Sequence, residues 1–151
     1  MHRKRIESVL KFNEERIRTI INGSLDAFIA IDEQGIITDW NRAAETLFGW
    51  DRNDAIGKTL SETIIPPQYD ERHRGGIKRF IDTGHGPVIN QRIELPALTR
   101  GGAQIPVEVA ISACEINDRH YFSAFLHDIS GRQMAAQALA EKQCLLDTIT
   151  N

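Results

Sequence analysis

The side chains of this chain that could carry chemistry include five histidines and two cysteines, and the spacing of most of them argues against a catalytic or metal centre. Cys114 and Cys144 lie far apart without a Cys-x-x-Cys pattern, so we expect reduced structural thiols rather than a disulfide or a zinc site. His120 and His127 are seven residues apart on one predicted strand, which places them on opposite faces. His85 stands in a Gly-His-Gly turn and is expected to be solvated. Because no nucleophile, base and orienting acid occur at a recognisable spacing, we expect no enzyme in this segment.

Composition indicates one folded domain that has to position these side chains. The 151 residues suffice for a single core, and the hydrophobic (41%) and charged (26%) fractions are typical of globular proteins. The net charge of -3 gives no electrostatic reason to expect nucleic acid or an anionic membrane as a partner. No apolar run approaches the roughly 20 residues of a membrane span, and no signal peptide opens the chain. We therefore expect a cytoplasmic segment without membrane contact of its own.

The last residues of the chain repeat a segment near its beginning. Residues 19–22 read Thr-Ile-Ile-Asn and return as Thr-Ile-Thr-Asn at residues 148–151, with similar flanking residues. A second copy that begins where the chain stops is expected of one member of a tandem array of domains. The repeat therefore predicts further domains in a longer protein and a role in passing on a state.

The N-terminal region carries a stripe of apolar residues at heptad spacing with one polar interruption. Its members are Ile6, Leu10, Asn13, Ile17 and Ile20, which we call the heptad stripe. Two such helices could bury the stripe against each other as a coiled coil, with the asparagine helping to fix the register. The alternative is a single amphipathic helix packed on its own domain.

Hydrophobic periodicity predicts an α+β domain between helices at both ends. Residues 27–32 and 36–40 flank a Glu-Gln-Gly turn, which indicates a β-hairpin. Asn41 can cap a helix over residues 42–48, and Asp51 can cap another. Trp40 and the nearby Trp50 are expected in the core or under a covering helix rather than stacked on a cofactor.

The second half of the chain is predicted as a loose helix, three strands and a final helix. Residues 68–82 form the helix, and each glycine of the pair Gly75-Gly76 within it costs about 1 kcal/mol relative to alanine. The strands are predicted over residues 88–95, 104–112 and 121–127. The spacing of Ser130 and Gln133 predicts a capping box for a helix over residues 132–146.

Four groups of residues together resemble the PAS sensory domains over about residues 24 to 132. They are Asp32-x-x-Gly35-x-Ile37-x-x-x-Asn41-x-x-Ala44-x-x-x-Phe48-Gly49, then Ile56-Gly57-Lys58, then Gly-Gly-x-x-Ile-Pro-Val at residues 101–107, and Asp128-Ile129-Ser130-x-Arg132. The last group is similar to the junction at which these domains lead into an output helix. The resemblance implies a PAS fold with a five-stranded antiparallel sheet, order 2-1-5-4-3, short covering helices and a cavity between them. It implies an N-terminal linker or coiled-coil helix (1–23), a PAS domain (24–130) and a C-terminal output helix (131–151).

Within this resemblance, His73 is similar to the axial haem ligand of FixL-type oxygen-sensing PAS domains. A neutral imidazole held on a helix suits haem iron, and Arg79 matches a family arginine that reaches a haem propionate. The alignment places apolar residues on the gas-binding side: Val107, Val109, Ile111, Ala124 and Leu126. The cofactor implied is haem b, and the alternative is that His73 caps or packs its helix.

This sequence departs from the haem-binding pattern at two positions. The family tyrosine three residues after the ligand is Gly76 here, and the distal arginine falls on Ile93. Arg92 is adjacent, but a slip of one residue in a strand points a side chain to the opposite face. Without a donor over the iron, carbon monoxide, nitric oxide or redox sensing is favoured over oxygen. The Gly-Arg-Asn-Cys motif of flavin-adduct photosensors is absent.

These observations predict a regulatory PAS module of a bacterial signal-transduction protein, such as a two-component histidine kinase or a cyclic-di-GMP enzyme. We expect it to sense a small ligand or to mediate dimerisation, and to relay a change through its C-terminal helix. The expected partners are a second copy, bound through the flanking helices, and adjacent PAS and output domains. One alternative is a haem-b gas or redox sensor with His73 as axial ligand, and another is a ligand-free dimerisation or spacer module.

Overall fold

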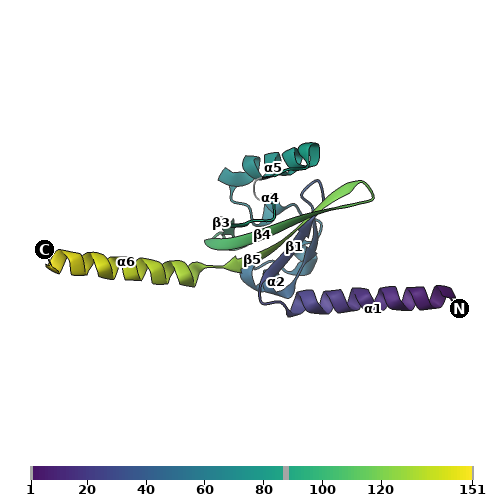
Figure 1. Ribbon diagram of the computed structural model, residues 1–151, viewed down its shortest axis with the longest axis horizontal. Helices are drawn as coiled ribbons and strands as arrows, with labels where there is room; N and C mark the ends of the chain where they lie inside the picture. Colours follow the sequence, from purple (N-terminus) through teal and green to yellow (C-terminus); the bar gives the residue numbers. More distant parts are fainter. Residues whose placement is uncertain (1, 87–88, 151) are drawn as a thin grey trace.

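The computed structural model describes residues 2–86 and 89–150, which form an antiparallel sheet with short covering helices and a long helix at each end (Figure 1). The elements in chain order are α1 (His2–Gly23), β1 (Ala27–Ile31), β2 (Ile37–Trp40), α2 (Arg42–Phe48), α3 (Arg52–Ala55), α4 (Leu60–Thr63), the 3-10 helix η1 (Pro67–Tyr69), α5 (Asp70–Thr83), β3 (Arg92–Leu98), β4 (Gln104–Ile116), β5 (Arg119–Asp128) and α6 (Ser130–Thr150).

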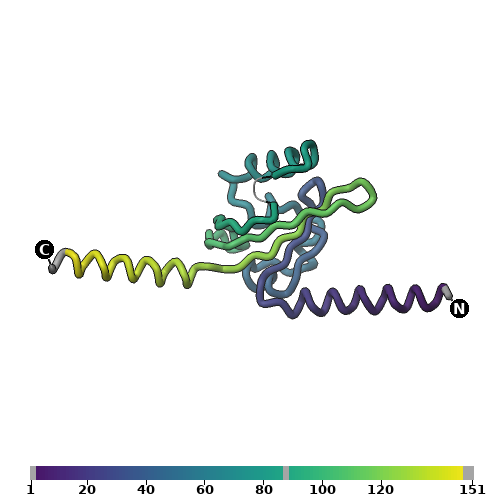
Figure 2. The backbone as a smooth tube through the Cα atoms, in the orientation of Figure 1, coloured from purple at the N-terminus to yellow at the C-terminus, as the bar shows by residue number. Residues whose placement is uncertain are grey.

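The sheet has the strand order β2-β1-β5-β4-β3, and each pair of neighbouring strands is antiparallel. This confirms the predicted α+β class and the predicted order. The long β4–β5 hairpin, traced in Figure 2, turns at Asn117 and Asp118, whose φ values of 52° and 64° suit a tight two-residue loop. Because β5 is central, the strand that leads into α6 is paired with both β1 and β4.

Strand β3 differs from its predicted bounds. A strand was expected over residues 88–95, whereas β3 runs from Arg92 to Leu98, and Val88 lies outside the described residues. Ile89 makes an isolated bridge to Ile111 ahead of the strand. Pro96 is accommodated because β3 is an edge strand, where a missing N–H removes no bond from the interior of the sheet.

Asn41 caps α2 as predicted, and its side chain also joins α1 to the sheet. The Oδ1 atom accepts from the N–H groups of Ala44 at 2.9 Å and Phe28 at 2.8 Å. The Nδ2 atom donates to the carbonyls of Ile21 at 2.8 Å and Asp26 at 3.1 Å. This buried side chain therefore satisfies four backbone groups that belong to α1, the α1–β1 turn, β1 and α2.

The other two predicted caps are wrong in detail. Asp51 precedes α3, but its side chain makes no capping bond, and the first N–H of α3 donates to Glu45 at 2.9 Å instead. Helix α6 begins at Ser130, so Ser130 and Gln133 form no capping box. The Ser130 N–H and hydroxyl donate to Asp128 Oδ1 at 2.8 and 2.5 Å, which gives the capping role to Asp128.

The tightest packing lies where α2 and α3 cover β1 and β2. Trp40 and Phe48 are fully buried with ring centroids 5.8 Å apart, and Ala44 and Ala55 close the gap between helix and strand. The Trp40 indole N–H donates to the Trp50 carbonyl at 2.9 Å, so both tryptophans belong to this packing, as expected.

Helices α1 and α6 extend away from the domain in different directions (Figure 1). The apolar residues of the heptad stripe are about half exposed or more, so α1 does not pack this stripe on its own domain. The C-terminal copy of the repeat, residues 148–151, lies outside the residues whose side chains are described. None of the helices in the described part of the chain has an apolar stretch long enough to cross a membrane.

Candidate functional site

A cavity of about 610 Å³ lies between α5 and the inner face of the sheet. Its walls come from β1, β3, β4, β5, α4, α5 and the residues on either side of α5. The sheet side is wholly apolar and is formed by Ile29, Ile31, Ile93, Leu95, Pro96, Ala97, Val107, Val109, Ile111, Phe122, Ala124 and Leu126. Alternation along the strands produces this wall, because every second side chain points to the same face.

Helix α5 contacts the rest of the domain through a few side chains, among them Ile77 and Phe80, which are partly buried against the core. At its N-terminus, Asp70 accepts a hydrogen bond from the hydroxyl of Ser61 in α4. At its C-terminal part, the Phe80 ring packs edge-on against Phe122, with centroids 5.4 Å apart. None of the described α5 residues is fully buried. A helix that is attached at few points can cover a cavity without filling it.

Gly75 and Gly76 both line the cavity in the middle of α5. A Cβ atom added at either position would meet no heavy atom within 4 Å. The predicted helix is therefore present and unbroken, and the glycines leave open space beneath it. Two large side chains at these positions would reduce the volume available to a ligand.

His73 is the one histidine among the described residues that line the cavity. Burial lowers the pKa of its imidazole, an effect that the carboxylate of Asp70 partly opposes. The side chain is therefore neutral at pH 7, and no hydrogen bond to it is formed within the described part of the chain. A neutral imidazole with a free lone pair can accept a hydrogen bond or ligate a metal.

The charged side chains on the cavity lining all come from α5. Glu71, Arg72 and Arg79 are exposed, and Arg72 lies over the Tyr69 ring at 5.8 Å from its centroid. They contribute one more positive than negative charge at the edge of an otherwise apolar space. A ligand bound here would meet hydrocarbon on the sheet side and charge at the helix side.

The structure brings together eight of the nine residues predicted for a cofactor site. The cavity lining includes His73, Arg79, Ile93, Val107, Val109, Ile111, Ala124 and Leu126. Arg92, the ninth, must be corrected as a site residue: it lies on the opposite face of the sheet, as its slip of one residue from Ile93 indicates, and forms an ion pair with Glu108 at 3.8 Å instead of lining the cavity. Strand alternation explains the difference, since Ile93 takes the inward position.

The side chains on the α5 side of the cavity fit haem, whereas the sheet side offers no ligand to its iron. His73 supplies a neutral imidazole, and Arg79 supplies a cation at the helix side for a propionate. The sheet wall supplies no hydrogen-bond donor from a side chain, because every residue on it is apolar.

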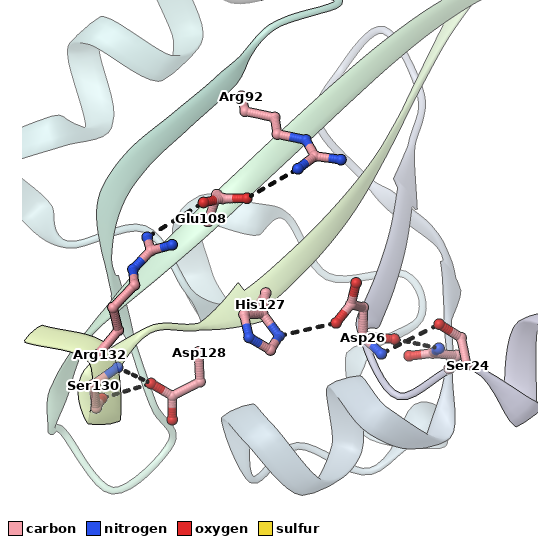
Figure 3. Close-up of polar contacts among 9 residues, drawn as sticks. Ser24, Asp26, Arg92, Glu108, His127, Asp128, Ser130 and Arg132 are labelled. Atoms are coloured by element: carbon pink, nitrogen blue, oxygen red, sulfur yellow. Dashed lines mark hydrogen bonds and ion pairs between the residues drawn. The ribbon is translucent and has the colours of Figure 1, made fainter.

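The junction between β5 and α6 is fixed by polar contacts on the outer face of the sheet (Figure 3). Asp128 holds Ser130, and these hydrogen bonds lower the pKa of the Asp128 carboxyl. Arg132 in the first turn of α6 reaches Glu94 of β3 and Glu108 of β4. The sequence pattern identified the Asp-Ile-Ser-x-Arg segment but not the two glutamates as its partners, because their pairing with each other follows only from the strand register.

A PAS fold model matches residues 15–129. An uncharacterised protein of Azorhizobium caulinodans is 39% identical over 127 residues, which cover 84% of this chain and 17% of that protein. The sensor protein FixL of Bradyrhizobium diazoefficiens is 32% identical over 141 residues, 93% of this chain and 28% of FixL. The cell-division control histidine kinase PdhS of Brucella ovis is 34% identical over 124 residues, 82% of this chain and 12% of PdhS.

Solved structures share the fold. The PAS domain of an HTR-like protein from Haloarcula marismortui aligns with a TM-score of 0.65 at 22% identity, over 83% of this chain and 99% of that one. The RpfR quorum-sensing receptor PAS domain of Cronobacter turicensis, solved in complex with C12:0, aligns with a TM-score of 0.57 at 18% identity, over 73% and 99%.

The match to the family model covers most of the chain, and the chain therefore belongs to the PAS family. It is a sensory regulatory module related to the PAS domains of sensor histidine kinases, and such a module is not itself catalytic. PAS domains in sensor kinases commonly dimerise and link to output domains. The chain spans less than a third of the length of each of these three relatives.

Proposed function

We propose that this PAS domain senses a small, largely apolar ligand bound in the cavity beneath α5. The observation that carries the proposal is the cavity itself, whose 610 Å³ falls within the roughly 300–1,000 Å³ of small-molecule sites. Its one wholly apolar wall and its one charged edge suit a ligand with a hydrocarbon body and a polar end. The acyl ligand C12:0 in the RpfR PAS domain is an example of such a molecule in the same fold.

The cavity favours a ligand sensor over a ligand-free spacer. In a spacer this hollow would serve no purpose, because the apolar side chains that line it lack packing partners on one side and contribute less to stability than they would in a filled core. Larger side chains at Gly75, Gly76 or Ala124 would fill it. In a domain that binds a ligand, the bound ligand supplies the packing contacts that the lining residues otherwise lack.

The relay runs from the sheet to the flanking helices in this proposal. A ligand can shift an equilibrium between two states only by the difference in its affinity for them, so the two states must differ in the contacts that they make with it. We propose that the domain comprises residues 24–130, that residues 1–23 form an N-terminal linker or coiled-coil helix, and that residues 131–151 form the output helix. Homodimerisation through α1 and α6 would bury the heptad stripe and the exposed apolar residues of α6, including Leu139.

The surrounding protein is proposed as a cytoplasmic bacterial signalling protein with adjacent PAS and output domains. Its similarity to segments of FixL and PdhS favours a two-component histidine kinase as the output, and a cyclic-di-GMP enzyme is the alternative. The segment itself would then supply regulation, with catalysis located elsewhere in the protein.

Thermal unfolding with dodecanoate as the probe tests the ligand proposal. A ligand that binds only the native state raises the melting temperature, and the rise grows with the ligand concentration. Ala124→Phe serves as the matched control, because a ring at Ala124 projects into the cavity from the centre of the sheet. We expect dodecanoate to stabilise the natural sequence and not the variant. Equal shifts in both proteins would contradict binding in this cavity.

Haem is a second candidate for the same cavity, favoured by the neutral imidazole of His73 on the lining. His73 would hold the iron and Arg79 a propionate, and bound haem would supply a centre that takes a diatomic gas or changes oxidation state. Because the sheet wall offers no side-chain donor, we favour carbon monoxide, nitric oxide or redox state over oxygen as the signal.

Titration with haemin separates the two candidates. Haem bound through His73 predicts a Soret band that is sharper than that of free haemin and shifted from it, that His73→Ala abolishes, and that His85→Ala, a change at an exposed turn residue, leaves intact. A Soret band identical to that of free haemin, or a shifted band that survives His73→Ala, would contradict haem ligation by His73.

A further inference from the structure

We infer that Arg132, held between Glu94 and Glu108, couples the cavity to the direction of α6. We call these three residues the Arg132 clamp. The inference rests on the proposed function, because it describes how a change in the cavity would reach the output helix. It assigns a positioning role to two glutamates that lie on the opposite face of the sheet from the cavity.

The clamp joins the first turn of α6 to β3 and β4, and Figure 3 shows its contact between Arg132 and Glu108. The Arg132 Nη2 atom lies 2.9 Å from Glu94 Oε1 and 3.3 Å from Glu108 Oε2. The other carboxylate oxygen of Glu108 lies 3.8 Å from Nη1 of Arg92. Arg132 therefore links α6 to both β3 and β4 and responds to their relative position. Arg92 pairs with Glu108 from β3.

The strand register explains why an arginine is needed at this place. Glu94 and Glu108 are directly paired across β3 and β4, and like charges in that arrangement repel each other. The guanidinium of Arg132 bonds to both carboxylates and offsets this repulsion. Any movement of one strand relative to the other changes the separation of the carboxylates and so the place where Arg132 sits.

The same strands carry the cavity wall. Ile93 and Leu95 flank Glu94 and both line the cavity, and Val107 and Val109 flank Glu108 and line it as well. Inward and outward side chains alternate on one backbone, so a ligand that displaces these four residues also displaces the two carboxylates. The cavity and the clamp are therefore separated only by the backbone of β3 and β4, and no longer series of contacts is required to couple them.

Helix α6 has a second attachment around which it can turn. Ile129 is buried, and its N–H donates to the Pro106 carbonyl of β4 at 3.1 Å. This backbone bond fixes where the helix leaves the sheet, and the Arg132 clamp, three residues further on, fixes its direction. Exposed ion pairs contribute little to stability, so the clamp should affect orientation much more than the melting temperature.

Distances between spin labels test the clamp in the 151-residue chain. Both cysteines are exposed, and they lie on β4 (Cys114) and α6 (Cys144), so labels at these positions report the direction of α6 relative to the sheet. Labelled protein is diluted with unlabelled protein so that distances within one chain dominate in any dimer. We expect Arg132→Gln, and the double variant Glu94→Gln with Glu108→Gln, to broaden the distance distribution. The control Arg92→Gln should leave it unchanged.

A cavity-filling change tests the coupling without any ligand. Ala124→Phe places a ring in the cavity, and we expect it to shift the distance distribution in the natural background but not in the Arg132→Gln background. High salt should broaden the distribution as Arg132→Gln does, because screening at 1 M acts over about 3 Å. Failure of dodecanoate to bind would contradict the proposed ligand and leave these measurements valid. Identical distributions for Arg132→Gln and the natural sequence, or the same shift from Ala124→Phe with and without Arg132, would overturn the clamp.

Discussion

The two helical covers of this sheet differ in how they pack. Helices α2 and α3 bury Ala44, Phe48 and Ala55 completely, whereas none of the described residues of α5 is fully buried. The first cover is filled with side chains, and the second encloses a cavity. One domain thus combines a rigid half that carries the stability with a loose half that has room for a ligand.

The difference arises from residue size and backbone attachment. Alanines let α2 and α3 approach the sheet until Trp40 and Phe48 fill the remaining space. On α5, the two glycines line the cavity, and a Cβ atom at either position would meet nothing within 4 Å. The helix reaches the core through partly buried side chains such as Ile77 and Phe80.

Trp40→Ala should lower the free energy of unfolding by about 3–5 kcal/mol, because it opens a hole in the filled half that the surroundings cannot close. Phe80→Ala, on α5, should cost about half as much, since Phe80 is only partly buried and already borders open space. Chemical denaturation of both variants measures the two values. Equal losses would contradict the division into a rigid and a loose half.

Asn41→Ala should lower the free energy of unfolding by about 3 kcal/mol. Four backbone groups around the buried Asn41 side chain would lose their hydrogen-bond partner, and those that water cannot reach would stay unsatisfied. Two of these groups belong to α1 and the turn after it, so proteolysis near residues 21–26 should also become faster. Asn53→Ala, at an exposed position of α3, is the control and should change little. A loss of stability without faster cleavage at the turn would contradict the role of Asn41 in holding α1.

Acidification should destabilise the protein through His73. Burial holds the pKa of His73 in the folded state below its value of 6.5 in the unfolded chain, so the unfolded state binds the proton more readily. Stability is therefore retained above pH 6.5 and falls as the pH drops through the folded-state pKa, with a slope of at most about 1.4 kcal/mol per pH unit from this residue.

Denaturation of the natural sequence and of His73→Gln over this range measures the contribution of His73. The variant should show a shallower decline toward low pH, and His85→Gln should decline as the natural sequence does. Parallel curves for all three proteins would contradict a buried neutral imidazole at position 73.

Gly76→Ala should raise the free energy of unfolding by about 0.5–1 kcal/mol, because it removes a glycine from a helix interior and its Cβ meets no atom. Gly75→Ala should do the same. Melting temperatures measure both changes. A matched substitution at Gly84, where φ is 73°, should instead destabilise, since alanine is strained there.

Much of this molecule could be predicted from its sequence because local patterns decide it. The alternation in Val107, Val109 and Ile111 identifies inward residues without any structure, and Asn41 at the start of an apolar helix is a recognisable cap. The family resemblance then supplied the strand order, which no local pattern contains.

The errors arose where long-range contacts decide the outcome. The start of β3 at Arg92 depends on its pairing with β4. The cap of α6 is a local exception, since Asp128 bonds Ser130 only two residues away. The pairing of Glu94 with Glu108 depends on the β3–β4 register, so Arg132 could not be matched to its partners in advance. The volume beneath α5 is likewise a property of the assembled fold.

Amide hydrogen exchange measured residue by residue tests the central contrast most directly. We expect α5 amides to exchange by local opening, with much lower protection than the amides of α2 and β1, because α5 buries little and covers a cavity. A ligand in the cavity should raise the protection of α5 and leave that of α2 unchanged. Equal protection of α5 and α2 in the ligand-free protein would show that the two covers do not differ in this way.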